Sequence, residues 1–225
     1  MVLMTTLLRI DASARGARSL SRRMTQTFVE TWLRSRPRDV VIARDLAADP
    51  PELITEAWIA SAFTDPAART PEQAKLLAPS DRLIDELERA DVIVLGAPMY
   101  NYGMPAALKA WFDQVIRIGR TFSFDLARGD WPLESVLSGK CLVTLSSRGE
   151  FGFGPGGERA HMNHLDPHIA TCARYLGVSE SYAISSEYQE FGDTRHERSV
   201  ASAFERVIEI ATRLAGRREW ANLRE

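Results

Sequence analysis

Short apolar runs alternate with helix-length amphipathic stretches along the 225-residue chain, and this alternation restricts the fold more than any other feature. Strands separated by helices of this length are typical of right-handed βαβ crossovers and a parallel sheet. Continuous apolar runs such as VIVLGA and CLVTLS suit strands that are buried on both faces. The sequence predicts five strands, at residues 3–10, 40–43, 92–97, 141–146 and 181–185.

Helical periodicity fills the intervals between these runs. Met24, Phe28 and Trp32 recur at i, i+4 and i+8, and apolar stripes also cover 108–116 and 200–214, where Gly216 follows as a helix stop. The segment 51–89 is too long for one crossover and is broken near its middle, which predicts helices over 52–63 and from 71 onward. We therefore predict one domain over 1–216 with a helical insertion at about 51–89, followed by a tail at 217–225.

The predicted fold is an α/β flavodoxin-like, doubly wound, five-stranded parallel sheet with strand order 2-1-3-4-5. In this order the switch point lies between the first and third strands, and ligands bind beyond the carboxyl ends of the strands. The loops of interest are therefore those after Ile10, Ala97 and Ser146.

Charge and composition exclude several classes of protein. Lys and Arg number 28 against 30 Asp and Glu, a net charge of −2 with both signs interspersed, so no nucleic-acid-binding face is expected. No apolar run approaches the roughly 20 residues that cross a bilayer, and the first residues lack the pattern of a secretion signal, so we expect a cytoplasmic protein with no membrane partner. Cys141 and Cys172 fit neither a disulfide framework nor a metal cluster.

The loop after the first strand suits a phosphate. Ser13, Ser19 and Ser21 offer hydroxyl groups, and the start of the following helix offers free backbone N–H groups and the positive end of its dipole. An ordinary helix with an N-cap serine would give the same pattern.

The loops after the third and fourth strands suit a flat ring. In the first, Pro98 and Pro105 bracket a short, rigid segment whose backbone amides could follow the edge of a heteroaromatic ring, although a plain βα turn would also fit. In the second, Gly149 permits close approach of the backbone to a ligand. The later GxGxxG string at 152–157 lies too far from the strand and contains a proline, which disfavours a dinucleotide-binding turn.

The residues that carry a family pattern are Ser13, Ser19, Ser21, Ala97, Pro98, Met99, Tyr100, Asn101, Leu108, Lys109, Phe112, Asp113, 119–122, Ser147, Arg148 and Gly149. Together they resemble the FMN-dependent NADH-azoreductase family of flavodoxin-like NAD(P)H:quinone oxidoreductases, and the likeness runs over most of the chain. Each segment alone would be a weak signal.

The resemblance implies an enzyme with FMN as cofactor and NADH or NADPH as co-substrate. Hydride would pass through flavin N5 to a quinone or azo compound in a ping-pong sequence, with no obligatory acid–base side chain in the protein. It also implies a homodimer with the site at the subunit interface. The implied phosphate ligands are Ser13, Ser19, Leu20 and Ser21, and the implied ring contacts are Met99, Tyr100, Asn101, Tyr102, Ser147, Arg148, Gly149 and Glu150.

Part of the dimer interface is expected within 51–89, because Trp58, Ile59 and Phe63 are a large apolar surface to leave in water. A flavodoxin-like electron carrier is an alternative function, although carriers tend to be smaller and strongly acidic. A regulatory protein on the same fold is another, since fold alone does not fix function.

Glu150 stands where the family commonly has a second glycine. An ionised carboxylate beside the N1–C2=O2 edge of the flavin would oppose the negative charge of the reduced ring and lower its potential, whereas a side chain in solvent would have little effect. The sequence leaves both readings open. The stretch 124–138 and the tail after Gly216 also depart from the family pattern.

Three histidines, His161, His164 and His168, have a spacing that could place them on one helix face as metal ligands. Asp166 and Pro167 instead resemble an N-cap and first helical residue, which would leave the first two histidines outside the helix. We therefore expect no metal site.

Overall fold

Five parallel strands form the centre of the fold in this computed structural model, which describes residues 4–217. Their order in the sheet is β2-β1-β3-β6-β7, so the predicted order 2-1-3-4-5 is confirmed, with the second strand at one edge. The strands are β1 (Thr6–Asp11), β2 (Val40–Asp45), β3 (Val92–Gly96), β6 (Lys140–Ser147) and β7 (Val178–Ser186).

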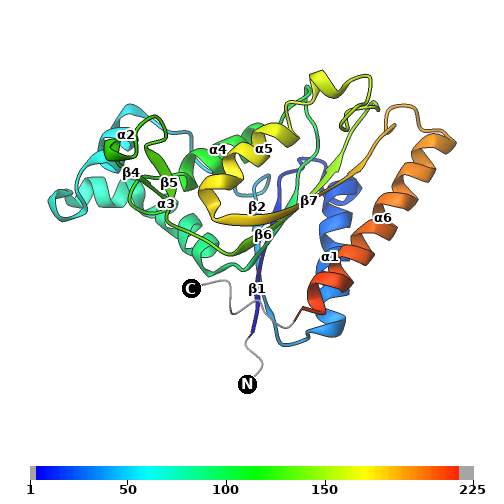
Figure 1. Ribbon diagram of the computed structural model, residues 1–225, viewed down its shortest axis with the longest axis horizontal. Helices are drawn as coiled ribbons and strands as arrows, with labels where there is room; N and C mark the ends of the chain where they lie inside the picture. Colours follow the sequence, from blue (N-terminus) through cyan, green and yellow to red (C-terminus); the bar gives the residue numbers. More distant parts are fainter. Residues whose placement is uncertain (1–3, 218–225) are drawn as a thin grey trace.

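Helices cover both faces of this sheet (Figure 1). On one face, α1 (Leu20–Ser35) and α6 (Thr194–Ala215) lie side by side over one apolar core, which includes Phe28 and Trp32. On the other face, α3 (Pro71–Arg89), α4 (Ala106–Val115) and α5 (Asp166–Ala173) enclose a second core.

Burial explains the apolar runs. Every residue of β3 and β6 is buried, because both strands lie inside the sheet with helices above and below, whereas every residue of β2 keeps some exposure at the edge. Trp32 is fully buried, and truncating such a side chain to alanine costs about 3–5 kcal/mol.

The segment 51–89 contains the two expected helices. The first, α2 (Glu56–Phe63), starts four residues later than predicted, because Thr55 is its N-cap and accepts a hydrogen bond from the backbone N–H of Trp58. The second, α3, starts at Pro71 with a capping box between Thr70 and Gln73.

The inner half of α3 packs against the sheet through Leu83, Ile84 and Leu87, so α3 also serves as the crossover from β2 to β3. Trp58 packs against Leu77 of α3 and is only 7% exposed. The expectation that Trp58 contributes to an apolar surface is therefore wrong.

A hairpin outside the central sheet was not predicted. It pairs β4 (Phe122–Phe124) with β5 (Leu133–Ser135) in antiparallel fashion and accounts for much of the stretch 124–138. Its loop leaves Leu126 and Trp131 largely exposed, at 74% and 76%. The boundary of the predicted domain at 216 stays a prediction, and the tail beyond Arg217 lies outside the described residues.

No helix in the described part of the chain combines the length and apolar character needed to cross a membrane.

Candidate functional site

The predicted phosphate residues gather at the start of α1. Ser19 is the N-cap and accepts a hydrogen bond from the backbone N–H of Arg22, and its hydroxyl lies 3.1 Å from that of Ser21. Ser13, Ser19 and Ser21 are all buried. The backbone N–H groups of Leu20 and Ser21 make no hydrogen bond within residues 4–217.

Two free N–H groups and the hydroxyls of Ser19 and Ser21 lie at the positive end of a helix dipole, with Ser13 in the loop before it, and such a set of donors suits a phosphate. Arg15 and Arg18 are exposed just before the helix and have no carboxylate partner in the described chain, so they add positive potential. The residues present therefore fit the phosphate of FMN.

Gly96, the last residue of β3, permits the close approach of this helix start. A Cβ at this position would lie 2.8 Å from Thr25 Cγ2 and 3.2 Å from the carbonyl oxygen of Ser21. A side chain there would push the first turn of α1 away from the sheet, so the phosphate region depends on glycine at this strand end.

Arg22 and Asp45 hold the loop after β1. The guanidinium of Arg22 donates to the carbonyl oxygen of Ser13 at 2.8 and 2.9 Å, and it also donates to both carboxylate oxygens of Asp45 at the end of β2. The hydrogen bonds from Arg22 hold the pKa of Asp45 at about 2, well below its ordinary value.

The loop after β3 is a tight turn from Tyr100 to Gly103. The backbone N–H of each of these two residues donates to the carbonyl oxygen of the other, at 2.9 and 3.0 Å. Asn101 and Tyr102 between them have φ angles of 47° and 66°, the pattern of a type I′ turn. Positive φ is uncommon for a tyrosine, and such strain is concentrated at functional sites.

In the loop after β6, the side chain of Arg148 is buried and does not face the predicted ring site. Arg148 is 3% exposed, and its guanidinium lies beneath the loop, where it donates to Asp166 at 2.5 Å and to Glu187 at 3.3 Å. It also lies 5.7 Å from the ring centroid of Phe153. The guanidinium of Arg148 is therefore occupied by these two carboxylates, and its backbone N–H donates to the carbonyl oxygen of Ser186 at 2.8 Å.

Hydrogen bonds join the three loops. The backbone N–H of Ala14 donates to the hydroxyl of Tyr100 at 3.3 Å, which links the first loop to the second. The second loop is linked to the third by the backbone N–H of Met99, which donates to the carbonyl oxygen of Ser147 at 2.9 Å. The predicted residues thus lie together at the carboxyl ends of β1, β3 and β6.

Glu150 does not stand alone in solvent. Its carboxylate accepts a hydrogen bond from the hydroxyl of Tyr102 at 3.3 Å and lies 3.7 Å from Nε of Arg159. The guanidinium of Arg159 also lies over the ring of Phe151, 4.4 Å from its centroid. The carboxylate is therefore near the predicted ring site, with a positive partner beside it.

Several residues that support these loops were not predicted. The backbone N–H of His164 donates to the carbonyl oxygen of Tyr102, and Glu187 accepts from the backbone N–H groups of Gly152 and Phe153. These contacts join positions far apart in the sequence, so no local pattern could have revealed them.

The three histidines do not share a helix face. His161 lies in a short 3₁₀ helix, His164 lies in the following loop, and only His168 belongs to α5. Helix α5 has Leu165 as its N-cap and Asp166 in its first turn, so the predicted N-cap was wrong by one residue. Within residues 4–217, no group of three or more His, Cys, Asp or Glu side chains could hold a metal ion.

Comparison with known proteins agrees with this arrangement. The Flavodoxin_2 family, described as a flavodoxin-like fold, matches residues 5–210. FMN-dependent NADH:quinone oxidoreductase 2 of Idiomarina loihiensis is 52% identical over 219 residues, covering 94% of this chain and 91% of that protein. FMN-dependent NAD(P)H:quinone oxidoreductase 1 of Pseudomonas aeruginosa is 38% identical over 209 residues, covering 92% and 99%.

A solved structure supports the fold. The crystal structure of azoreductase from Bacillus anthracis has a TM-score of 0.83 at 22% identity and covers 93% of this chain and all of that one. The matched family and the relatives above place the chain in the family of flavodoxin-like, FMN-dependent NADH:quinone oxidoreductases.

Proposed function

We propose that the protein is an FMN-dependent oxidoreductase that passes a hydride from NADH or NADPH through flavin N5 to quinones or azo compounds. The observation that carries this proposal is the joining of three loops at the carboxyl ends of β1, β3 and β6, with phosphate donors on the first and backbone edges on the other two. The names of relatives at 52% identity support the same cofactor and reaction.

The first loop would bind the FMN phosphate through the hydroxyls of Ser13, Ser19 and Ser21 and the N–H groups of Leu20 and Ser21. The other two loops would hold the ring. The lining residues are Met99, Tyr100, Asn101, Tyr102, Ser147, Arg148, Gly149 and Glu150, and the guanidinium of Arg148 holds its loop in place through Asp166. FMN supplies the redox chemistry when bound, and the protein supplies orientation and electrostatics.

Stacking of both substrates on one open face of the ring would require them to bind in turn, which is a ping-pong sequence. No titratable side chain needs to donate or accept a proton at the reacting atom. Half-exposed Tyr102 stands at the edge of the ring site, where it could contact either substrate.

We also propose a homodimer with the site at the subunit interface. Phe63 of α2 is 69% exposed, and Trp131 of the hairpin is 76% exposed. Both lie on the side of the molecule that carries α2 and the β4–β5 hairpin (Figure 1). Large exposed apolar side chains of this kind mark interaction surfaces. Light scattering at micromolar concentration should give twice the chain mass, and a fully active monomer would contradict the dimer.

A cytoplasmic location is in keeping with two buried free thiols, since cytosolic proteins keep their cysteines reduced. The alternative of a single-electron carrier is disfavoured by the net charge of −2, because carriers dock through strongly charged surfaces.

The deciding experiment is a visible absorption spectrum of the purified protein, followed by addition of NADH in air-free buffer. The proposal predicts bound FMN, rapid bleaching by NADH, and recovery of colour when a quinone is added. A protein that neither carries nor takes up FMN would exclude the enzyme and the carrier together. Bound FMN that NADH does not bleach would favour the carrier.

A further inference from the structure

The segment 187–191, which follows β7, runs beside the loop after β6. Three successive carbonyl oxygens of that loop accept hydrogen bonds of 3.0 to 3.1 Å from backbone N–H groups of the segment. The carbonyl oxygens of Arg148, Gly149 and Glu150 accept from Gln189, Glu190 and Tyr188 respectively. The loop after β6 is therefore held along one side by a stretch of chain that carries none of the predicted site residues.

These hydrogen bonds determine which way the N–H groups of the loop face. In a trans peptide the C=O of one residue and the N–H of the next point in opposite directions, and the described chain has no cis peptide bond. The N–H groups of Gly149, Glu150 and Phe151 therefore face away from the segment 187–191. None of the three donates a hydrogen bond within residues 4–217. The loop thus offers three adjacent free donors.

The carboxylate of Glu187 binds the two N–H groups that come next. Its Oε2 accepts from the N–H of Gly152 at 3.0 Å, and its Oε1 accepts from the N–H of Phe153 at 3.3 Å. The same Oε1 accepts from the guanidinium of Arg148 at 3.3 Å. Phe153 is buried, so loss of the carboxylate would leave its N–H without a partner in the described chain, which is costly. One side chain therefore holds both ends of the row of free donors.

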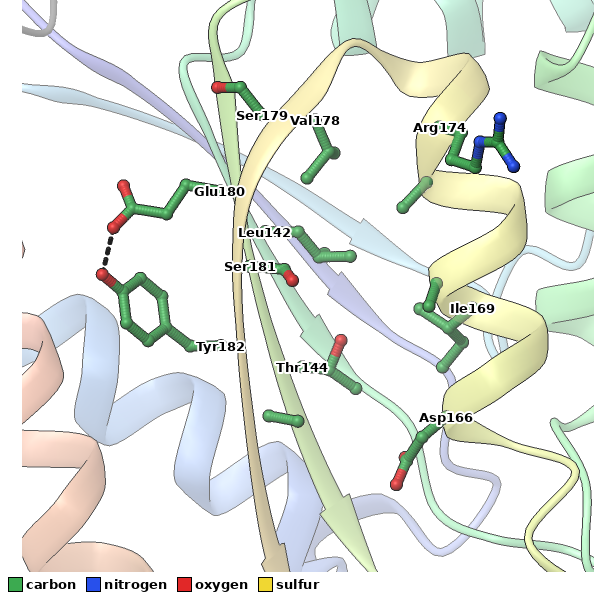
Figure 2. A pocket seen from close by; sticks show the side chains of 13 residues that line it. Leu142, Thr144, Asp166, Ile169, Arg174, Val178, Ser179, Glu180, Ser181 and Tyr182 are labelled. Atoms are coloured by element: carbon green, nitrogen blue, oxygen red, sulfur yellow. Dashed lines mark hydrogen bonds between the residues drawn. The ribbon is translucent and has the colours of Figure 1, made fainter. Parts of the chain in front are cut away.

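Glu187 is in turn held by helices outside the three loops. Its backbone N–H donates to the hydroxyl of Ser199 on α6 at 2.9 Å, and its carbonyl oxygen lies 3.1 Å from Nδ1 of His196. Arg148 has a second carboxylate partner in Asp166, at the first turn of α5, where Asp166 also lines a groove between α5 and β7 (Figure 2). The support of the loop after β6 therefore reaches both faces of the sheet.

We propose that Glu187 is a positioning residue, which holds the loop after β6 so that the N–H groups of Gly149, Glu150 and Phe151 face the flavin. This proposal rests on the FMN-dependent function proposed above. The reduced ring carries negative charge at its N1–C2=O2 edge, and hydrogen bonds to a charged acceptor are the stronger ones. Donors held at that edge therefore favour reduced FMN over oxidised FMN, and loss of Glu187 weakens the binding of reduced FMN more.

The test compares Glu187→Ala and Glu187→Asp with the wild type. The first variant removes the carboxylate, and the second keeps its charge but shortens its reach by one CH₂ group. In each, the dissociation constant of reduced FMN should rise about tenfold more than that of oxidised FMN, which lowers the two-electron midpoint potential by about 30 mV. Fluorescence titration measures the binding of oxidised FMN, and reduction against a reference dye measures the midpoint potential.

The sign of the shift separates position from charge. Removal of a nearby carboxylate would by itself favour the negative reduced ring and raise the midpoint potential, so a lower potential in Glu187→Ala reports lost donors. The control is Glu197→Ala in the first turn of α6, where an exposed carboxylate makes no hydrogen bond or ion pair within the described residues. It should leave the midpoint potential unchanged.

Hydrogen exchange tests the same role without relying on the flavin. The N–H groups of Gly152 and Phe153 bind Glu187 in the wild type, so both should exchange at least about tenfold faster in Glu187→Ala. Exchange of Val143, inside β6, should stay at the wild-type rate if the variant is folded. If Glu187→Ala does not fold, Glu187→Asp takes its place in this measurement.

The outcomes separate this proposal from the proposed function. A wild-type protein that takes up no FMN would refute the proposed function, and the positioning role with it. Bound FMN that NADH bleaches, with unchanged midpoint potentials in both Glu187 variants, would overturn the positioning role alone. A raised potential in Glu187→Ala would also overturn it, because the carboxylate would then act through its charge. Unchanged exchange at Gly152 and Phe153 would contradict the hold on the loop.

Discussion

Arg22 binds Asp45 through two hydrogen bonds of 2.6 Å and, with the same guanidinium, holds the carbonyl oxygen of Ser13. The pair thus connects the start of α1 to the end of β2 and fixes the loop on which the phosphate hydroxyls stand. Asp45 also accepts hydrogen bonds from the backbone N–H groups of Ala47 and Ala48. One carboxylate therefore organises two loops.

We expect Asp45→Asn to weaken FMN binding severalfold, because the Ser13 loop loses the anchor of its arginine. Turnover at saturating FMN should stay near the wild-type rate. The matched control is Asp49→Asn, which breaks an exposed ion pair with Arg44 and should leave FMN affinity unchanged. Fluorescence titration of FMN measures both, and equal affinities for wild type and Asp45→Asn would contradict the anchoring role.

The pair of Arg22 and Asp45 also predicts how the stability of the protein changes in acid. The pKa of Asp45 is lowered to about 2, so its stabilising contribution is present above the ordinary carboxyl pKa and is lost as the pH falls toward 2. The free energy of unfolding should therefore fall more steeply between about pH 4 and pH 2 in the wild type than in Asp45→Asn. Parallel curves for the two proteins would exclude this linkage.

Replacing both Ser19 and Ser21 by alanine should weaken FMN binding, since each lost hydrogen bond to a charged phosphate is worth about 1.5–3 kcal/mol. Activity should return with excess FMN. Ser19 also caps α1, so its loss lowers stability by about 0.5–2 kcal/mol as well.

Thr70→Ala separates the loss of stability from the loss of FMN binding. It removes the N-cap of α3, far along the chain from the serines, and should lower stability without changing FMN affinity. An unchanged dissociation constant in the double serine variant, measured by fluorescence, would place the phosphate elsewhere.

Glu150→Gln and Arg159→Gln should shift the flavin potential in opposite directions. The carboxylate opposes the negative charge of the reduced ring and the guanidinium offsets the carboxylate, so the first change should raise the two-electron midpoint and the second should lower it. We expect shifts of about 20 mV, or roughly 1 kcal/mol, because both groups are partly exposed.

The double variant should return close to the wild-type midpoint potential. Shifts smaller than about 10 mV in both single variants, with unchanged turnover, would mean that the Glu150 carboxylate lies outside the field of the ring.

Cys141 should resist alkylation in the native protein. It is 1% exposed, and burial raises the pKa of its thiol to about 12, so almost no thiolate forms at neutral pH. Mass spectrometry after iodoacetamide should find Cys141 unmodified until the protein is denatured. Cys172 is the internal comparison, with a buried thiol whose pKa is also raised. Rapid native labelling of Cys141 would contradict the packing of β6.

The central sheet could be predicted because its strands are distinguished by local pattern. The runs of β3 and β6 are apolar at every position, and the stripes of α1, α4 and α6 repeat with helical period. The edge strand β7 (Val178–Ser186) is longer than the predicted strand at 181–185. Its first residues alternate between partly buried and exposed, and Ser179 and Glu180 are polar, so no apolar run marks where the strand begins. The β4–β5 strands have three residues each, too few for a period to appear.

Trp58 illustrates why burial could not be predicted. The residues around it in the sequence fit a place in a subunit interface as well as a place inside the protein. Trp58 is buried because it packs against Leu77 on the next helix, a contact that the sequence does not show. The candidate site could likewise be predicted only where no contact between distant segments was needed. The resemblance supplied the loop residues, whereas their supports, Arg22, Arg159 and Glu187, depend on contacts between distant segments. Arg148 is the clearest case, because a sequence cannot show which way a guanidinium points.

The hydrogen bonds among the three loops also affect how quickly a cofactor could be exchanged. Loops that are held in place before a ligand arrives lose little conformational entropy when it binds, so most of that cost is incurred during folding. Protein stripped of FMN should then rebind it in a single kinetic phase, limited by encounter rather than by rearrangement. The hydrogen bond between Ala14 and Tyr100 joins the first loop to the second. It would keep the FMN-free and FMN-bound structures of the protein nearly identical.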